Sequence, residues 1–311
     1  MTPSLPSVRR RAPAAQQPTL NQRLGYSPSA RLLILHLDDI GMLHATNAAA
    51  AAAFETGVAN SGSLMVPCQW FPEAAAYARA HPALDLGLHL TFTSERPAYR
   101  WGPVLGAASV PTLVDEQGYF PITWDESRRV DLRELEAELR AQLARARLLG
   151  VVPTHLDSHE HRLQWLGRPI FELFLRVATE QRLPIRVGRN WFEQYTYLAP
   201  ALGPEGIALD RAITIPPSVP PDQWINWYVD TLHELRPGVT ELFLHVGRDD
   251  EELRAFAPPQ FSWGAAWRQR DLEAITSPAV RDALVDAEVT LITWRQIGRL
   301  LVDKSPRAPE R

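Results

Sequence analysis

The chain has 311 residues, of which 45% are hydrophobic and 22% are charged, and its formal net charge is -4. These values are typical of a globular protein with a sizeable core, and the weak negative charge predicts neither nucleic acid nor an anionic membrane as a partner. The single cysteine, Cys68, excludes an intramolecular disulfide and a cysteine-rich zinc site, so we expect a reducing compartment, the cytoplasm. No apolar run reaches the about 20 residues that a membrane-spanning helix needs.

Both ends of the chain have a composition that predicts flexibility. Residues 1–20 are rich in proline, alanine, glutamine and arginine, and residues 304–311 are similarly polar. We therefore expect one folded domain at 21–303 between two flexible segments.

Between these ends, apolar strand-like runs alternate with helical patterns, which is typical of a parallel α/β protein. The predicted strands are residues 31–37, 61–66, 85–91, 152–157, 184–187, 240–246 and 288–292. The predicted helices are residues 45–56, 72–79, 132–149, 167–181, 222–236, 278–286 and 294–301. About seven mainly parallel strands in one α/β domain predict a single distorted (β/α) barrel.

Two adjacent acids close the first predicted strand. The apolar run ends in Asp38 and Asp39, and Gly41 follows. Neighbouring carboxylates repel each other unless a cation or a shared proton relieves the repulsion, which favours a functional site. The alternative is that one acid caps the helix that follows, and the pair alone leaves both interpretations open.

Histidines and a third acid occupy the next strand ends. Strand alternation places His89 on the face opposite Leu88 and Leu90, where a single histidine is more often a hydrogen-bonded core residue than a ligand. The segment 154–161 reads THLDSHEH. If it is extended, its acid at 157 and its histidines at 159 and 161 share one face, a concentration that an ordinary core does not tolerate. A solvated loop is the alternative.

A fourth group lies on the sixth predicted strand, where alternation places Glu241 and His245 on one face. In a parallel α/β barrel the carboxyl ends of all strands meet at one mouth. The four groups would therefore converge on a single site. This convergence, rather than any single motif, predicts a metal-dependent hydrolase.

These motifs resemble those of the YdjC-like carbohydrate deacetylases, a family akin to the larger group of polysaccharide deacetylases. The likeness extends from about residue 32 to 301. The features that carry it are Asp38-Asp39-Ile40-Gly41, Asn47, Gly57-Val58-Ala59-Asn60-Ser61, Gly87-Leu88-His89 and Thr154-His155-Leu156-Asp157-Ser158-His159. The chain departs from the family at His245-Val246-Gly247, where His-Pro-Gly is common, but it keeps the histidine.

The resemblance implies a hydrolase that removes an N-acetyl group from an amino sugar or a short acetylated oligosaccharide. It implies one divalent cation, with Asp39, His89 and His159 as ligands and Asp38 as the general base. It points to Mg²⁺ in some members, whereas one carboxylate and two imidazoles favour Zn²⁺ or a softer transition metal, so the choice between Mg²⁺ and Zn²⁺ stays open.

The remaining residues receive supporting roles. His245, or His161 as the alternative, would protonate the leaving amine, and Asp157 would orient an imidazole. We also place Glu241 near the site as a supporting residue and expect Trp101 to stack on a sugar ring.

Two other functions stay open at this point. A metal-dependent hydrolase of another ester or phosphoester could use the same acids and histidines, but no glycine-rich loop for a phosphate is evident. A catalytically silent sugar-binding protein would share the fold, although it has no need for both a base and a set of ligands. The expected partner is a small carbohydrate, and a homodimer is left open.

Overall fold

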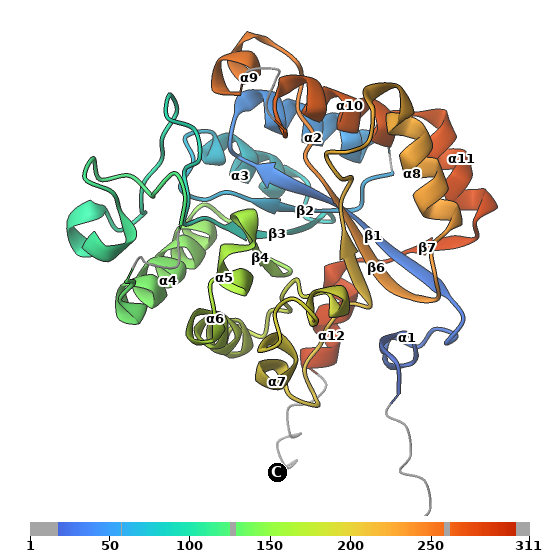
Figure 1. Ribbon diagram of the computed structural model, residues 1–311, viewed down its shortest axis with the longest axis horizontal. Helices are drawn as coiled ribbons and strands as arrows, with labels where there is room; N and C mark the ends of the chain where they lie inside the picture. Colours follow the sequence, from blue (N-terminus) through green and yellow to red (C-terminus); the bar gives the residue numbers. More distant parts are fainter. Residues whose placement is uncertain (1–17, 57, 125–128, 258–261, 303–311) are drawn as a thin grey trace, which may run out of the picture.

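The computed structural model describes residues 18–56, 58–124, 129–257 and 262–302. Its central feature is a parallel sheet that runs through the middle of the molecule (Figure 1). Its strands are β1 (Arg31–Ile40), β2 (Ser61–Leu64), β3 (Asp85–Leu90), β4 (Leu156–Ser158), β5 (Arg211–Ile213), β6 (Gly238–Leu244) and β7 (Val289–Leu291). The strand order is β4-β3-β2-β1-β6-β5, and β7 pairs with β1. The predicted parallel α/β architecture is confirmed.

The sheet curls into a distorted barrel, as predicted. Two isolated parallel bridges, Leu156–Ile185 and Gly188–Leu209, connect the edge at β4 with the segment that enters β5. The predicted strand at 184–187 is therefore present only as this bridging segment. The sequence did not predict β5, because its three residues carry too short a pattern to distinguish from a loop.

Helices flank the curled sheet (Figure 1). The seven predicted helices are confirmed as α2 (His44–Glu55), α3 (Phe71–Ala80), α4 (Leu132–Leu148), α6 (Arg168–Glu180), α8 (Trp224–His233), α11 (Pro278–Asp286) and α12 (Trp294–Val302). In the part of the chain that the structure describes, five further α-helices were not predicted, and they are α1 (Leu20–Arg23), α5 (Arg162–Trp165), α7 (Leu198–Leu202), α9 (Glu251–Phe256) and α10 (Ala265–Thr276). None of the described helices is long and apolar enough to cross a membrane.

The central strand β1 determines where polar side chains can collect. Leu32 and Ile34 are fully buried on one face of β1, and strand alternation continues this face into His36 and Asp38. Both polar residues are also buried, with at most 3% of their surface exposed. The same face of β1 therefore changes from apolar to polar toward the carboxyl end of the sheet, which is where the sequence placed the site.

The predicted flexible ends fall largely outside the described residues, since neither 1–17 nor 303–311 is described. Within the described part, Leu20 is buried at the start of α1. The side chain of Thr19 caps this helix by accepting a hydrogen bond from the backbone N–H of Gln22.

Gly87 in β3 lets the backbone of β3 lie close to the backbone of His155, just before β4. We expect this close contact to be essential for the packing of β3 on β4. A Cβ atom at Gly87 would lie 2.6 Å from the backbone oxygen of His155. Because backbone cannot move aside as a side chain can, Gly87→Ala should lower the free energy of unfolding by about 1–3 kcal/mol, measured by urea denaturation.

The matched control is Gly298→Ala in α12, where the nearest contact is 3.6 Å away. Alanine favours a helix, so this variant should be as stable as wild type or more stable. Equal destabilisation in both variants would contradict the packing argument.

Candidate active site

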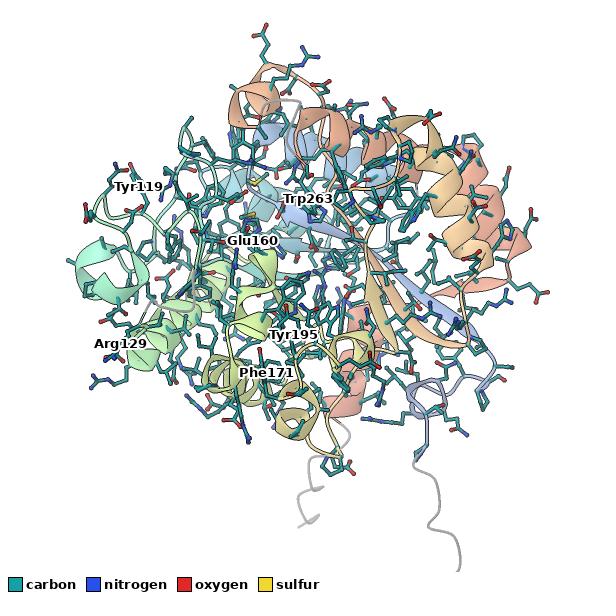
Figure 2. The ribbon with its side chains drawn as sticks, in the orientation of Figure 1. Tyr119, Arg129, Glu160, Phe171, Tyr195 and Trp263 are labelled. Carbon is teal, nitrogen blue, oxygen red and sulfur yellow. The ribbon has the colours of Figure 1, made fainter. Side chains whose placement is uncertain are left out.

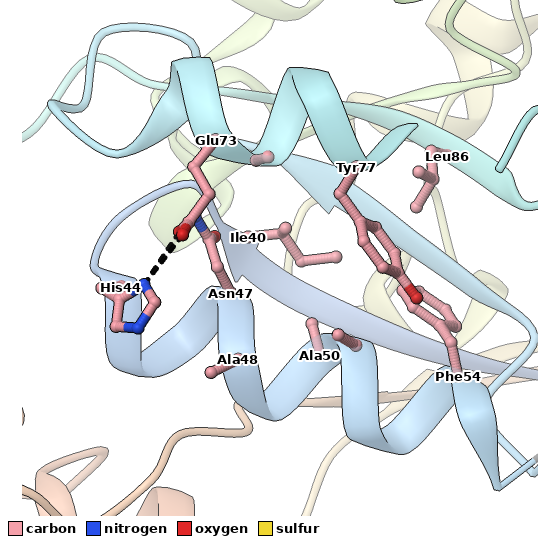
Figure 3. Close-up of a pocket in the computed structure, with 11 residues that line it drawn as sticks. Ile40, His44, Asn47, Ala48, Ala50, Phe54, Glu73, Tyr77 and Leu86 are labelled. Carbon is pink, nitrogen blue, oxygen red and sulfur yellow. Dashed lines mark hydrogen bonds and ion pairs between the residues drawn. The ribbon is translucent and has the colours of Figure 1, made fainter. Parts of the chain in front are cut away.

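A strained turn at the end of β1 separates the two adjacent acids. Asp39 has a φ of 64°, in the left-handed region, and Gly41 follows with a φ of 94°. Asn47 of α2 holds this turn, because its side chain accepts a 2.6 Å hydrogen bond from the backbone N–H of Gly41 and donates one of 2.7 Å to Glu73 of α3. Figure 3 shows Asn47 between the two helices, beside Glu73. The left-handed turn interrupts strand alternation, so Asp38 and Asp39 do not point to opposite faces of the sheet and both can line one cavity.

The three predicted metal ligands lie close together. The Oδ1 atom of Asp39 lies 3.1 Å from Nδ1 of His159 and 3.3 Å from Nε2 of His89. Two ligands bound about 2.1 Å from one cation are about 3.0–3.4 Å apart when the angle between them is between about 90° and 109°. The distance from Asp39 to each imidazole therefore suits one small cation, and all three donor atoms lie within 4.8 Å of one another. Sequence reasoning selected all three residues.

Asp157 lies behind His89 rather than at the cation site itself. Its Oδ1 atom is 2.9 Å from Nδ1 of His89, and its Oδ2 atom accepts a 2.9 Å hydrogen bond from the hydroxyl of Ser63. Burial opposes a charge on His89, but Asp157 and Asp38 outweigh it and raise the pKa of His89 to about 9. When the imidazole is neutral, the contact with Asp157 places its proton on Nδ1 and leaves Nε2 free to bind a metal.

A fully buried arginine that the sequence analysis missed organises the floor of the site. Arg186 donates to both oxygens of Asp38 over 2.7 and 2.9 Å. It also pairs with Asp157 at 2.8 Å and with Glu241 at 2.9 Å. Burial disfavours the charge of Asp38, but Arg186 outweighs burial and holds the pKa of Asp38 well below its usual range. Asp38 is therefore ionised at neutral pH, as a general base requires.

His245 follows β6 and faces the same acid. Its Nε2 atom lies 3.8 Å from Oδ2 of Asp38. Burial lowers the pKa of His245 to about 4, so its imidazole is neutral in the resting protein at pH 7. Its backbone N–H donates a 3.1 Å hydrogen bond to Asp271 of α10, which also accepts hydrogen bonds from Trp224 and Tyr228. These contacts fix the strand end that carries His245.

Helix α10 contributes a second arginine that sequence reasoning missed. Arg268 donates a 2.6 Å hydrogen bond to Oδ2 of Asp39, the oxygen that does not face the histidines. It also donates to the backbone oxygen of Trp263 over 2.8 Å. Arg268 leaves one oxygen of Asp39 for a cation and compensates part of the charge that the carboxylate keeps.

A cavity of about 650 Å³ opens above these groups. Its lining includes Asp38, Asp39, His89, His159 and His245. Figure 2 shows two further residues of its wall, Glu160 and Trp263, near the middle of the view. A volume of this size lies within the range of small-molecule sites, about 300–1,000 Å³.

The supporting residues from the sequence analysis lie in three different places. His161 lines the cavity, and burial lowers its pKa to about 3. Glu241 is fully buried below the cavity, beside Arg186. Trp101 is 1% exposed and its indole N–H donates to the backbone oxygen of Thr93, so its ring packs against the protein rather than against the cavity.

The chain is similar to known proteins over most of its length. Residues 32–286 match the model of the family described as YdjC-like protein. A carbohydrate deacetylase of Thermus thermophilus is 35% identical over 91% of this chain and 99% of its own length. A chitooligosaccharide deacetylase of Yersinia pestis is 28% identical over 82% of this chain and 94% of its own length.

A solved structure has a similar fold. A protein of Enterococcus faecalis, described as a candidate cellobiose-phosphate cleavage protein, superimposes with a TM-score of 0.73. It is 25% identical and covers 86% of this chain and 99% of its own. Sequence and structure together show that the chain belongs to the YdjC-like family.

Proposed function

We propose that this protein is a metal-dependent deacetylase that hydrolyses the N-acetyl group of an amino sugar or a short acetylated oligosaccharide. The observation that carries the proposal is the convergence of Asp39, His89 and His159, whose donor atoms lie within 4.8 Å of one another at the cavity that also contains Asp38. The names of the relatives from Thermus thermophilus and Yersinia pestis support a carbohydrate amide as the substrate class.

The three converging residues would hold one divalent cation. A cation bound there would polarise the substrate carbonyl and lower the pKa of water. Its identity stays between Mg²⁺ and Zn²⁺, since imidazole suits zinc and carboxylate suits either. Arg268 would compensate the negative charge that Asp39 retains.

Asp38 and His245 would move the proton that hydrolysis transfers. Water adds its oxygen to the carbonyl carbon, and Asp38 accepts the proton that water loses. His245, whose Nε2 atom lies 3.8 Å from Oδ2 of Asp38, is the group that we propose takes this proton from Asp38. His245 then protonates the nitrogen as its bond to the carbonyl carbon breaks, which releases the free amine and acetate.

Aromatic side chains in the cavity support a sugar substrate. Trp165 and Trp263 both line it, whereas Trp101 does not. Trp165 stacks on Tyr195 with ring centroids 5.2 Å apart, so one face of its ring is already covered. We propose that the apolar surface of these two tryptophans contacts sugar rings, in place of the predicted role of Trp101. A cytoplasmic location and a homodimer stay predictions from the sequence.

Phosphoester hydrolysis is the competing activity, because arginines line the cavity. Two of the three pair with a carboxylate, since Arg268 pairs with Asp39 and Arg162 pairs with Glu160 at 3.1 Å. The third, Arg96, donates to the backbone oxygen of Ser262 over 3.5 Å. Cations that are already paired favour a neutral substrate over a phosphate. The discriminating assay compares acetate release from acetylated chitooligosaccharides with phosphate release from sugar phosphates.

Metal removal should abolish activity. Dialysis against a chelator should reduce acetate release to background, and one equivalent of a divalent cation per chain should restore it. One equivalent should be enough because the three donor groups converge on one binding position. Elemental analysis checks that the chelated protein is free of metal. Full activity in metal-free protein contradicts the proposal.

The adjacent acids should respond differently to the same substitution. Asp39→Asn should weaken metal binding, because a neutral amide is a poorer ligand than a carboxylate. Asp38→Asn should retain the metal but lose about 10²- to 10⁴-fold in turnover, because an amide cannot accept the proton. Metal content, melting temperature and turnover should be measured for both variants.

The matched control for both substitutions is Asp131→Asn. Asp131 caps α4 by accepting a hydrogen bond from the backbone N–H of Arg133, and asparagine caps a helix nearly as well. This variant should keep wild-type metal content and turnover. Wild-type turnover in Asp38→Asn would remove Asp38 from the role of general base.

Asp271→Asn should change stability in a way that depends on pH. Burial raises the pKa of Asp271 to about 6, against 3.8 for the ordinary group. The folded state thus binds a proton that the unfolded state releases between these values, so this contribution to stability is complete below 3.8 and is lost as the pH rises through 6. The stability advantage of wild type over Asp271→Asn should shrink by about 1.4 kcal/mol between pH 5 and pH 8.

Urea denaturation at both pH values measures this difference. Asp286→Asn, on the exposed surface of α11, is the control and should differ from wild type by the same amount at both. A difference between wild type and Asp271→Asn that does not change with pH would show that Asp271 is ionised across the range.

A further inference from the structure

Glu95 is an acidic residue of the cavity wall to which neither the sequence motifs nor the proposed mechanism gives a role. It follows β3 in the loop after Thr93 and is only 18% exposed. Its Oε2 atom lies 3.1 Å from Nε2 of His159. The opposite nitrogen of the same imidazole, Nδ1, is the one that lies 3.1 Å from Asp39.

Both proposed histidine ligands therefore lie between two carboxylates. His89 lies between Asp39 and Asp157, and His159 lies between Asp39 and Glu95. The geometry differs in one respect, since Nε2 of His89 but Nδ1 of His159 faces the shared carboxylate Asp39. The carboxylate on the far side thus contacts Nδ1 in the first case and Nε2 in the second.

We propose that Glu95 is a positioning residue that fixes the proton of His159 on Nε2 and so presents Nδ1 to the cation. A neutral imidazole has one N–H donor and one lone pair, and a carboxylate can only accept, so the nitrogen beside Glu95 must carry the proton. The lone pair is then on Nδ1, beside Asp39. This inference rests on the proposed metal site.

The surroundings of the ring allow no second arrangement with the same contacts. Rotating the imidazole of His159 by half a turn would place carbon atoms against both Asp39 and Glu95 and would lose both polar contacts. The ring of Trp101 packs at 6.2 Å from the His159 ring, edge to face. Trp101, which the sequence analysis assigned to a sugar, thus restricts the motion of His159.

The backbone beside Glu95 is also fixed. Ser94 is fully buried, and its backbone N–H donates a 2.9 Å hydrogen bond to the oxygen of Pro121. The hydroxyl of Ser94 accepts hydrogen bonds from the backbone N–H of Trp101 and from Arg100. Glu95 therefore reaches His159 from an anchored position, as a residue that orients a ligand should.

The test measures metal binding and coordination rather than turnover. Wild type, Glu95→Gln and Glu95→Ala are titrated with Co²⁺, and the dissociation constant and the visible absorption spectrum are recorded. We expect Glu95→Ala to bind Co²⁺ about 10- to 100-fold more weakly, the usual effect of removing a residue that orients a ligand. Glu95→Gln keeps an oxygen acceptor, so its loss should be smaller and its spectrum should match that of wild type.

Glu116→Ala, an exposed glutamate in a loop after β3, is the matched control and should bind Co²⁺ as wild type does. Nitrogen chemical shifts of the zinc-loaded wild type should show His159 protonated on Nε2. A purely structural role for Glu95 would not determine the position of this proton. Melting temperatures of all variants check that they are folded.

The possible outcomes separate this inference from the proposed function. If wild type binds no Co²⁺, the proposed metal site is wrong and the role of Glu95 fails with it. If wild type binds but Glu95→Ala binds equally well, only the role of Glu95 is wrong. A spectrum altered equally in Glu95→Gln and Glu95→Ala would make Glu95 a direct ligand and would also overturn the positioning role.

Discussion

The site depends on one buried guanidinium. Arg186 is fully buried and ion-paired with Asp38, Asp157 and Glu241, which come from β1, β4 and β6. Three carboxylates without a cation would repel one another and would lose their hydration on burial, at a cost that the fold could not compensate. Arg186 therefore connects three strands, keeps Asp38 ionised, and holds the carboxylate that orients His89. The proposed general base and one proposed metal ligand depend on the same charge.

Because of the left-handed turn at Asp39, each of the two acids pairs with a different arginine. A regular strand would send Asp38 and Asp39 to opposite faces of the sheet, so only one of them could reach the mouth. The turn instead lets both line the cavity, with Asp38 held by Arg186 and Asp39 held by Arg268. Such strain persists only where the surroundings fix it, and Asn47 does so through the backbone of the turn.

The sequence predicted the residues at strand ends and missed those that reach the site from elsewhere. Asp39, His89 and His159 could be found because strand alternation and the parallel sheet together place them at one mouth. Arg186 lies in the predicted strand 184–187, and the presence of a charged residue in an apolar strand could have indicated a role in the site. Arg268 and Glu95 offered none, since α10 was not predicted and the loop after β3 has no periodicity. Trp101 failed as a sugar contact for the same reason, because no pattern reports which way a loop residue faces.

The arrangement of charge at this site would accommodate the proposed divalent cation in place of two protons. Each imidazole of the pair His89 and His159 contacts two carboxylates, and the nearby acids raise the pKa of both rings above the ordinary value. Without a metal, each ring would keep a second proton to satisfy the carboxylate it shares, Asp39. One divalent cation at this point carries the same charge as those two protons, and it leaves Asp157 and Glu95 with their hydrogen bonds. An exchange of two protons for the proposed cation would therefore conserve both the charge and the contacts of the buried site, and would let a metal bind without a rearrangement of the residues around it.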